Sequence, residues 1–106
     1  MQTLETLNQT IKENPAVMLY FSAPTCNVCH ALKPKLLEAM NENFKTFEIE
    51  SIDVSTDAEI AAHFSVFAIP TVLVFLDGRE FLRKSRHMSV GEVINEIKRP
   101  YEIMMS

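Results

Sequence analysis

The sequence predicts an α/β fold in which a mixed sheet of at least four strands is flanked by helices on both faces. Two observations lead to this prediction. Nearly all-apolar runs, typical of strands covered on both faces, alternate with stretches of helical periodicity, and this alternation favours parallel pairing. The last two expected strands are joined by Asp77-Gly78, a two-residue hairpin turn, so this pair is expected to be antiparallel.

The first half of the chain predicts a helix, a strand and a second, longer helix. Leu4, Leu7 and Ile11 recur at helical spacing, and Asn14-Pro15 is expected to end that helix. Residues 16–22 are almost wholly apolar and read as a central strand. The long helix contains Pro34, which is expected to kink it. Its apolar positions are Ala31, Leu32, Leu36, Leu37 and Met40.

The second half predicts three further strands and two helices. Residues 45–54 read as a strand of uncertain register, and Ser55-Thr56-Asp57 is expected to cap a helix that carries Ile60, Ala61 and Phe64. Strands are expected at residues 72–76 and 80–82, on either side of the hairpin turn. Ser89-Val90-Gly91-Glu92 reads as a capping box for the last helix, which Pro100 is expected to end or kink.

Size and composition favour one ordinary globular domain over residues 1–106. The 106 residues are 47% apolar and 23% charged, and the net charge is −4. This acidic balance argues against a nucleic-acid partner, and no run approaches the ~20 apolar residues of a membrane span. The N-terminus Met1-Gln2-Thr3-Leu4-Glu5 lacks the basic start and apolar run of a signal peptide, so the cytoplasm is the expected location.

The two cysteines, Cys26 and Cys29, are the strongest functional feature of the chain. They form a C-x-x-C motif between an expected strand and an expected helix, the typical setting of a thiol–disulfide redox site. Free N–H groups and the positive dipole end of the first helical turn favour a thiolate. A disulfide across so short a loop would add little stability, so its role is expected to be chemical.

Three other interpretations of the motif are weaker. A zinc site needs a second pair of ligands, and His30, His63 and His87 are scattered along the chain. Cys26-x-x-Cys29-His30 also fits covalent haem attachment, but this would require export and a largely helical wrap around the haem. The third alternative is a pair of inert buried thiols.

In this motif and in the expected order of its elements, the chain resembles the thioredoxin family over nearly its whole length. Pro34 falls five residues after Cys29, where the family has a helix kink, and Ile69-Pro70-Thr71 looks like its cis-proline segment. Asp77-Gly78 matches the family's hairpin, and residues 89–97 match its closing helix. The resemblance implies a thioredoxin-like three-layer sandwich with a mixed sheet of four to five strands.

The resemblance also implies roles for individual residues. Cys26 would be the exposed nucleophile, and Cys29 the shielded thiol that resolves the mixed disulfide. Pro70 would lie against the sulfurs in the cis form, and the backbone of Ile69 would pair with a substrate segment. Thr25 would join them in binding substrate. No metal or organic cofactor is implied, because the redox group is the Cys26–Cys29 disulfide.

The departures from the family pattern mark candidate modulators of the site. Thr25 stands where the family usually has Trp, and Asn27-Val28 where it has Gly-Pro. Tyr20 stands where the family carries a buried Asp thought to help proton exchange at the resolving cysteine, and the Lys partner of that Asp aligns near Ser51. An unperturbed tyrosine has a pKa of about 10, too high for a base at neutral pH.

His30 is a further candidate modulator, since a protonated imidazole close to a sulfur would favour the thiolate; a solvent-facing role is the plainer alternative. A basic cluster, residues 79–87, is interpreted as charge that protects an edge strand, with a docking patch for an acidic partner as the alternative. Met104 and Met105 at the end of the chain are expected to pack rather than to stay exposed.

The function predicted from sequence is a thiol–disulfide oxidoreductase of cell redox homeostasis and electron transport, which reduces protein disulfides through Cys26 and Cys29. The alternatives are a disulfide oxidant or isomerase, a reductase of mixed disulfides with small thiols, and a non-catalytic binding module. The expected partners are disulfide-containing proteins or low-molecular-weight disulfides and an upstream thiol reductase. No nucleic acid or membrane partner is expected, and the chain is expected to act as a monomer.

Overall fold

The computed structural model describes residues 3–106 and shows eight elements in the expected alternating order. Met1 and Gln2, part of the N-terminus considered for a signal peptide, lie outside the described residues. The helices are α1 (Leu4–Glu13), α2 (Asn27–Asn43), α3 (Ala58–His63) and α4 (Val90–Met105). The strands are β1 (Ala16–Ser22), β2 (Glu48–Asp53), β3 (Thr71–Leu76) and β4 (Arg79–Ser85).

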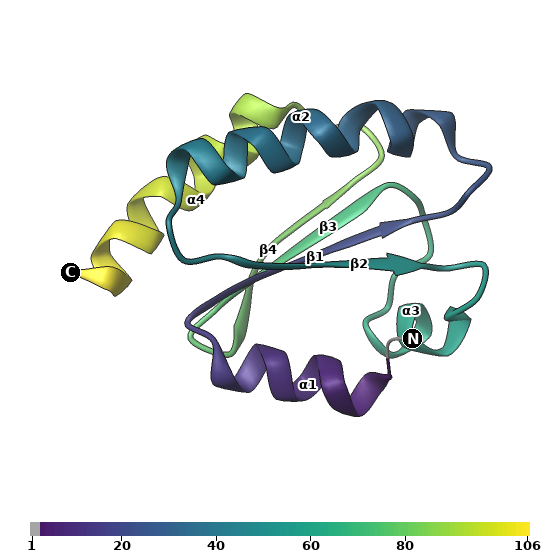
Figure 1. Cartoon of the computed structure of the whole chain (residues 1–106), viewed down its shortest axis with the longest axis horizontal. Helices are drawn as coiled ribbons and strands as arrows, with labels where there is room; N and C mark the ends of the chain where they lie inside the picture. The colour runs from purple at the N-terminus through teal and green to yellow at the C-terminus, as the bar shows by residue number, and fades with distance from the viewer. Residues whose placement is uncertain (1–2) are drawn as a thin grey trace.

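The strands form one mixed sheet in the order β2-β1-β3-β4. β1 pairs in parallel with β2 and antiparallel with β3, and β3 pairs antiparallel with β4. The central strands β1 and β3 are buried along almost their whole length, because helices cover both faces of the sheet. Figure 1 shows the three layers, with α2 and α4 on one side of the sheet and α1 and α3 on the other.

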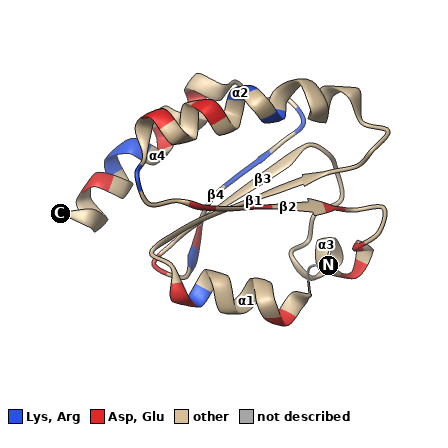
Figure 2. Cartoon of the chain, in the orientation of Figure 1, with Lys and Arg blue, Asp and Glu red and all other residues tan. Residues whose placement is uncertain are grey.

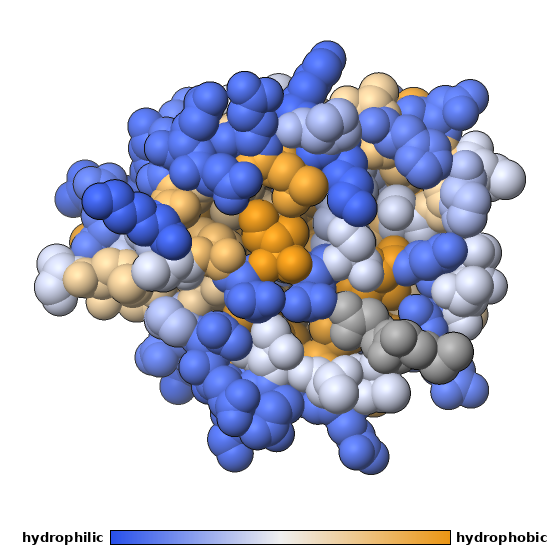
Figure 3. All heavy atoms as spheres, viewed as in Figure 1, coloured by the Kyte–Doolittle hydropathy of each residue, from blue (hydrophilic) through white to orange (hydrophobic). Residues whose placement is uncertain are grey.

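Alternate residues of β1 face two separate apolar cores. Met18 and Tyr20 lie in the core beneath α2 and α4, whereas Leu19 and Phe21 lie in the core beside α1 and α3. This follows from the two-residue period of a strand, which sends successive side chains to opposite faces. Figure 3 shows hydrophilic side chains over the outer surfaces of the helices and apolar atoms in the band between the layers.

Several local predictions are confirmed. α1 ends at Glu13, and Asn14 caps it through a backbone hydrogen bond to Thr10. Asp77 and Gly78 both have positive φ, 54° and 79°, as a two-residue hairpin turn of this kind requires. Met104 packs partly against the core, whereas Met105 stays 44% exposed, so only one of the two packs as expected.

The structure corrects three other expectations. The strand predicted over residues 45–54 covers only Glu48–Asp53. The Asp57 side chain makes no cap hydrogen bond to α3, and the Ser55 hydroxyl instead donates to the Asp53 carboxylate. Only half of the expected capping box on α4 forms. Ser89 accepts the Glu92 N–H, but the Glu92 carboxylate binds Lys84 instead of returning to the cap.

Pro100 does not end α4, which continues to Met105. The reason is packing beyond the proline: the ring of Tyr101 lies 4.9 Å from that of Phe44 and 5.6 Å from that of Phe47. Pro34 likewise lies inside α2, which continues to Asn43.

Candidate functional site

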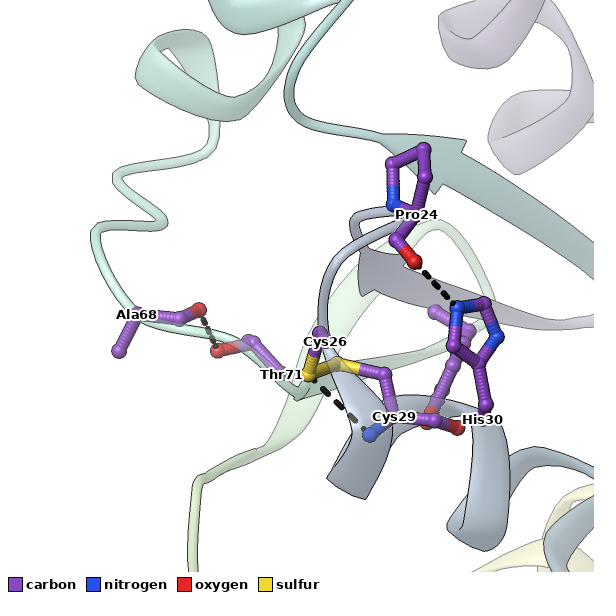
Figure 4. The surroundings of a disulfide bond; sticks show 7 residues. Pro24, Cys26, Cys29, His30, Ala68 and Thr71 are labelled. Atoms are coloured by element: carbon purple, nitrogen blue, oxygen red, sulfur yellow. Dashed lines mark hydrogen bonds between the residues drawn. A yellow bond between two sulfur atoms is a disulfide. The ribbon is translucent and has the colours of Figure 1, made fainter.

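The two cysteines lie at the end of the central strand β1, where the chain turns into α2. The backbone N–H of Cys26 donates to the Ala23 carbonyl at 3.0 Å, and this bond closes the turn between the strand and the helix. Cys26 is the N-cap of α2 and Cys29 lies in its first turn. Cys26 and Cys29 are joined by a disulfide, with Cα atoms 5.3 Å apart (Figure 4).

The two sulfurs have different surroundings. Cys29 is fully buried, whereas Cys26 is half-buried and reaches the surface. The backbone N–H of Cys29 donates to the sulfur of Cys26 at 3.1 Å, so a helix N-terminal donor points at the more exposed sulfur. A donor in this place stabilises negative charge on that sulfur once the disulfide is opened.

Tyr20 anchors the first turn of α2 to the sheet. Its hydroxyl, on buried strand β1, donates to the carbonyl oxygen of Cys29 at 2.7 Å. Burial raises the pKa of the Tyr20 phenol above its ordinary value of 10.0, so the hydroxyl stays protonated and remains a donor at neutral pH. Ser51, where the family's lysine would align, is paired with Tyr20 across β1 and β2. Neither position therefore carries a charge.

His30 forms a hydrogen bond on the outer side of the same turn. Its Nε2 lies 2.9 Å from the carbonyl oxygen of Pro24, a contact that Figure 4 shows beside the disulfide. Because a carbonyl oxygen only accepts, Nε2 carries the proton in this bond. The side chain is exposed, and this hydrogen bond goes to the loop before Cys26 rather than to a sulfur.

The proline segment reaches the same end of the sheet. The Ile69–Pro70 peptide bond is cis, and β3 begins at the next residue, Thr71. Thr71 is paired with Phe21, near the end of β1, and its hydroxyl donates to the Ala68 carbonyl at 2.7 Å. The antiparallel pairing therefore places the start of β3 at the sheet end that carries the disulfide.

An apolar hollow of about 270 Å³ lies beside this segment. Ile69 lines it together with Val54, Val66, Phe67 and alanines of α3, whose small side chains leave the space open. Phe67 is 85% exposed, which is unusual for a phenylalanine and was not expected from the sequence. Its place two residues before Ile69 is the signal that could have marked it.

The other predicted site residues differ in their exposure. Thr25 is exposed in the turn before Cys26, and Asn27 and Val28 are exposed on the first turn of α2, with Val28 63% accessible. Pro70 is buried, and Ile69 is half-buried at the rim of the hollow. The role of the Pro24 carbonyl could not be predicted from the sequence, because every residue carries a backbone carbonyl.

The basic cluster of residues 79–87 lies on and just after β4, which is an edge strand as interpreted from the sequence. Arg83 binds the Glu80 carboxylate at 2.9 Å. Lys84 binds those of Glu92 and Glu96 at 3.0 and 2.7 Å. Arg79, Arg86 and His87 are exposed.

Two features of residues 3–106 bear on other functions. None of the helices there is long and apolar enough to cross a membrane. No group of three or more His, Cys, Asp and Glu residues is arranged to hold a metal ion in that part of the chain.

Comparisons with known proteins agree on one family. The thioredoxin family model matches residues 1–99. The thioredoxin-like protein YdfQ of Bacillus subtilis is 34% identical over 103 residues, which cover 97% of this chain and 91% of YdfQ. The thioredoxin of Mycobacterium tuberculosis is 33% identical over 73 residues, 69% of this chain and 63% of that protein.

Solved structures give the same result. Thioredoxin 1 of Thermosipho africanus is 37% identical and superposes with a TM-score of 0.76, over 85% of this chain and 99% of that one. Oxidised mitochondrial thioredoxin 3 of Saccharomyces cerevisiae, 22% identical, shares the fold with a TM-score of 0.82 over 92% and 91% of the two chains. With its mixed sheet, its helix layers and its disulfide at the start of α2, the chain belongs to the thioredoxin family and is a thiol–disulfide oxidoreductase.

Proposed function

We propose that this protein reduces disulfides of other proteins by dithiol–disulfide exchange at Cys26 and Cys29. The observation that carries the proposal is the unequal exposure of the two bonded sulfurs at the start of α2. The half-buried Cys26 sulfur can meet a partner, whereas the buried Cys29 sulfur can react only with Cys26. This difference assigns the attacking role to one cysteine and the resolving role to the other.

In the first step the reduced protein attacks with Cys26. Its thiolate, stabilised by the Cys29 N–H, forms a bond to one sulfur of the substrate disulfide, and the substrate S–S bond breaks. The departing substrate sulfur leaves as a thiolate and takes up a proton. The product is a mixed disulfide between Cys26 and the substrate.

In the second step the Cys29 thiolate attacks the Cys26 sulfur. The Cys26–Cys29 bond forms, the mixed disulfide breaks, and the second substrate sulfur leaves as a thiolate. Two electrons have then passed from the protein to the substrate. A dithiol reductant, the expected upstream partner, returns the protein to its reduced form by the reverse exchange.

The presence of Tyr20 in place of the family's buried Asp determines where the proton of the Cys29 thiol goes. Because burial raises the pKa of its phenol, Tyr20 does not accept the Cys29 proton at neutral pH. The proton of the Cys29 thiol passes instead to the departing substrate sulfur or to water. Tyr20 holds the Cys29 carbonyl, and with it the first turn of α2, in place beneath the disulfide.

Substrate would bind along the segment that precedes β3. Ile69 and Pro70 lie at the sheet end that carries the disulfide, and Thr25 is exposed in the turn directly before Cys26. The 270 Å³ hollow beside Ile69 is below the ~300–1,000 Å³ typical of small-molecule sites, so it suits one apolar side chain of a protein substrate.

The test uses the two cysteine variants against a protein disulfide such as that of insulin. Cys29→Ser should accumulate a mixed disulfide that intact mass spectrometry detects, while Cys26→Ser should form none, and both should lose turnover. Accumulation on Cys26→Ser instead would reverse the assigned roles. If wild type reduces no disulfide, the proposed function is wrong.

The direction of electron flow is tested by the reduction potential of the pair. Alkylation and intact mass across thiol buffers should give a reduction potential of about −270 mV for a reductant. A value of about −120 to −180 mV would instead favour the oxidant or isomerase alternative.

A further inference from the structure

Arg86 follows the edge strand β4 in a backbone conformation that is unusual for arginine. Its φ is 58°, in the left-handed region that glycine, asparagine and aspartate normally occupy. Its backbone N–H donates to the carbonyl oxygen of Pro70 at 2.7 Å. The residue is therefore tied to the cis-proline segment while it holds a conformation that disfavours a long side chain. A residue held in such a conformation calls for a functional explanation.

Strand register places Arg86 at the disulfide end of the sheet. Thr71 is paired with Phe21 on β1 and with Ser85 on β4, the residue just before Arg86. Neighbouring strands lie about 4.8 Å apart, so β4 is roughly 10 Å from β1, whose end leads to Cys26. This distance is close to the Debye length of about 8–10 Å at physiological salt, so a charge on Arg86 acts on what binds there.

The guanidinium of Arg86 is free to bind a partner. The nearby cations of β4 are occupied, because Arg83 binds Glu80 and Lys84 binds Glu92 and Glu96. The exposed Arg86 side chain has no ion pair or hydrogen bond to any residue from 3 to 106. Its five donors form a planar fork that matches a carboxylate.

The opposite side of this sheet end has the opposite charge. Figure 2 shows Lys and Arg along β4 and the loop after it, whereas β2 and α3 carry Asp and Glu. Asp57 occupies the N-cap position of α3 and the exposed Glu59 lies in its first turn, on either side of Ala58, which lines the apolar hollow. A carboxylate on a bound segment is therefore attracted on the β4 side and repelled on the α3 side.

We infer that Arg86 binds a carboxylate next to the substrate disulfide, so that this site prefers acidic protein segments. This rests on the proposed reduction of protein disulfides, and it makes Arg86 a specificity residue of that reaction. The interaction is an exposed ion pair, so a preference of about two- to five-fold is expected at low salt. Screening at about 1 M salt should remove it.

The experiment compares two peptides that are each closed by a disulfide and differ only in carrying Glu or Gln on either side of one cysteine. The protein is reduced with a dithiol, freed from it and mixed with excess peptide. The single-turnover rate is followed by acid quench and mass spectrometry. Each Glu-to-Gln rate ratio is divided by the ratio that free dithiothreitol gives, which removes the intrinsic reactivity of the peptides.

Wild type should prefer the Glu peptide, and Arg86→Gln should bring the ratio to about one. Arg86→Gly, which suits the positive φ, should do the same and excludes a folding defect, while Arg86→Lys should keep part of the preference. Arg79→Gln removes the same charge at the far end of β4 and is the matched control that keeps the wild-type ratio. Equal rates with both peptides, or a preference unchanged in Arg86→Gln, would overturn the inference alone. Failure to reduce either peptide would overturn the proposed function with it.

Discussion

The two sides of the Cys26–Cys29 disulfide are held in different ways. On the inner side, a fully buried hydrogen bond joins Tyr20 of the central strand to the carbonyl of Cys29. On the outer side, the contacts are exposed and local, such as that of His30 with Pro24. A buried polar group that loses its partner costs far more than an exposed one, because water cannot replace the partner. The inner side should therefore control stability, and the outer side should tolerate change.

The variant Tyr20→Asp, which introduces the acid usual in the family, should have the largest effect. It removes a buried ring, leaves the Cys29 carbonyl without its side-chain donor and buries a carboxyl. The loss of a buried aromatic side chain alone costs about 3–5 kcal/mol, so the free energy of unfolding should fall by at least about 3 kcal/mol. Urea unfolding of the oxidised protein measures this.

The loss should also depend on pH. A carboxyl buried without a partner has a raised pKa in the folded state, so its burial costs least below its ordinary pKa, and the cost grows as pH rises from the ordinary to the raised value. The deficit relative to wild type should therefore be larger at pH 7 than at pH 4. A deficit below about 1 kcal/mol at pH 7 would show that this region accommodates a charge, and that the inner side is not the rigid one.

A smaller change, Tyr20→Phe, isolates the hydroxyl. The ring stays and only the hydrogen bond to Cys29 is lost, so unfolding should become easier by about 1 kcal/mol. The bond ends on a backbone carbonyl, which does not change on oxidation of the sulfurs. The oxidised and reduced proteins should therefore lose similar amounts, and the reduction potential should stay near that of wild type.

The second tyrosine provides the matched control. The hydroxyl of Tyr101 accepts the backbone N–H of Thr46 at 3.2 Å and lies 2.7 Å from the Thr46 hydroxyl, in a part-buried region far along the chain from the cysteines. Tyr101→Phe should cost less than Tyr20→Phe, because Thr46 is exposed and water can bind both its backbone N–H and its hydroxyl. Equal losses in the two variants would remove the distinction between the inner side and other parts of the molecule.

Most of the fold could be predicted from the sequence because the strongest patterns are decided locally. The apolar run of β1 and the Asp77-Gly78 turn specify a strand and a hairpin by themselves. The sequence left open whether α4 ends or kinks at Pro100, since its continuation depends on Tyr101 packing on Phe44 and Phe47 from a distant segment. Tertiary packing there outweighs the local preference to end the helix.

The site, like the fold, has some features that could be predicted from the sequence and others that could not. The spacing of Cys26 and Cys29 marks the reactive pair because the chemistry depends on residue type. The partners of Tyr20 and His30 are backbone carbonyls, which every residue carries, so no pattern of side chains could identify them. The conformation of Arg86 escaped prediction for a similar reason, because a positive φ is common at glycine and rare at arginine.

The smallest effect is expected at an exposed turn on the same end of the sheet. Asp53 accepts hydrogen bonds from the backbone and hydroxyl of Ser55 at 2.9 and 2.6 Å, and these bonds lower the pKa of its carboxyl below the ordinary 3.8. A carboxyl with a lowered pKa stabilises the fold above its ordinary pKa, and this contribution fades as pH falls through the lowered value. Asp53→Asn should therefore be slightly less stable than wild type at pH 7, and the difference should narrow toward pH 3. Urea midpoints measured over this range check it, with Glu59→Gln as the control for removing one exposed charge. A difference that stays constant or widens on acidification would mean that the charge of Asp53 does not stabilise this turn. The exposed contacts at this end of the sheet would then depend on the packing of the buried residues beneath them.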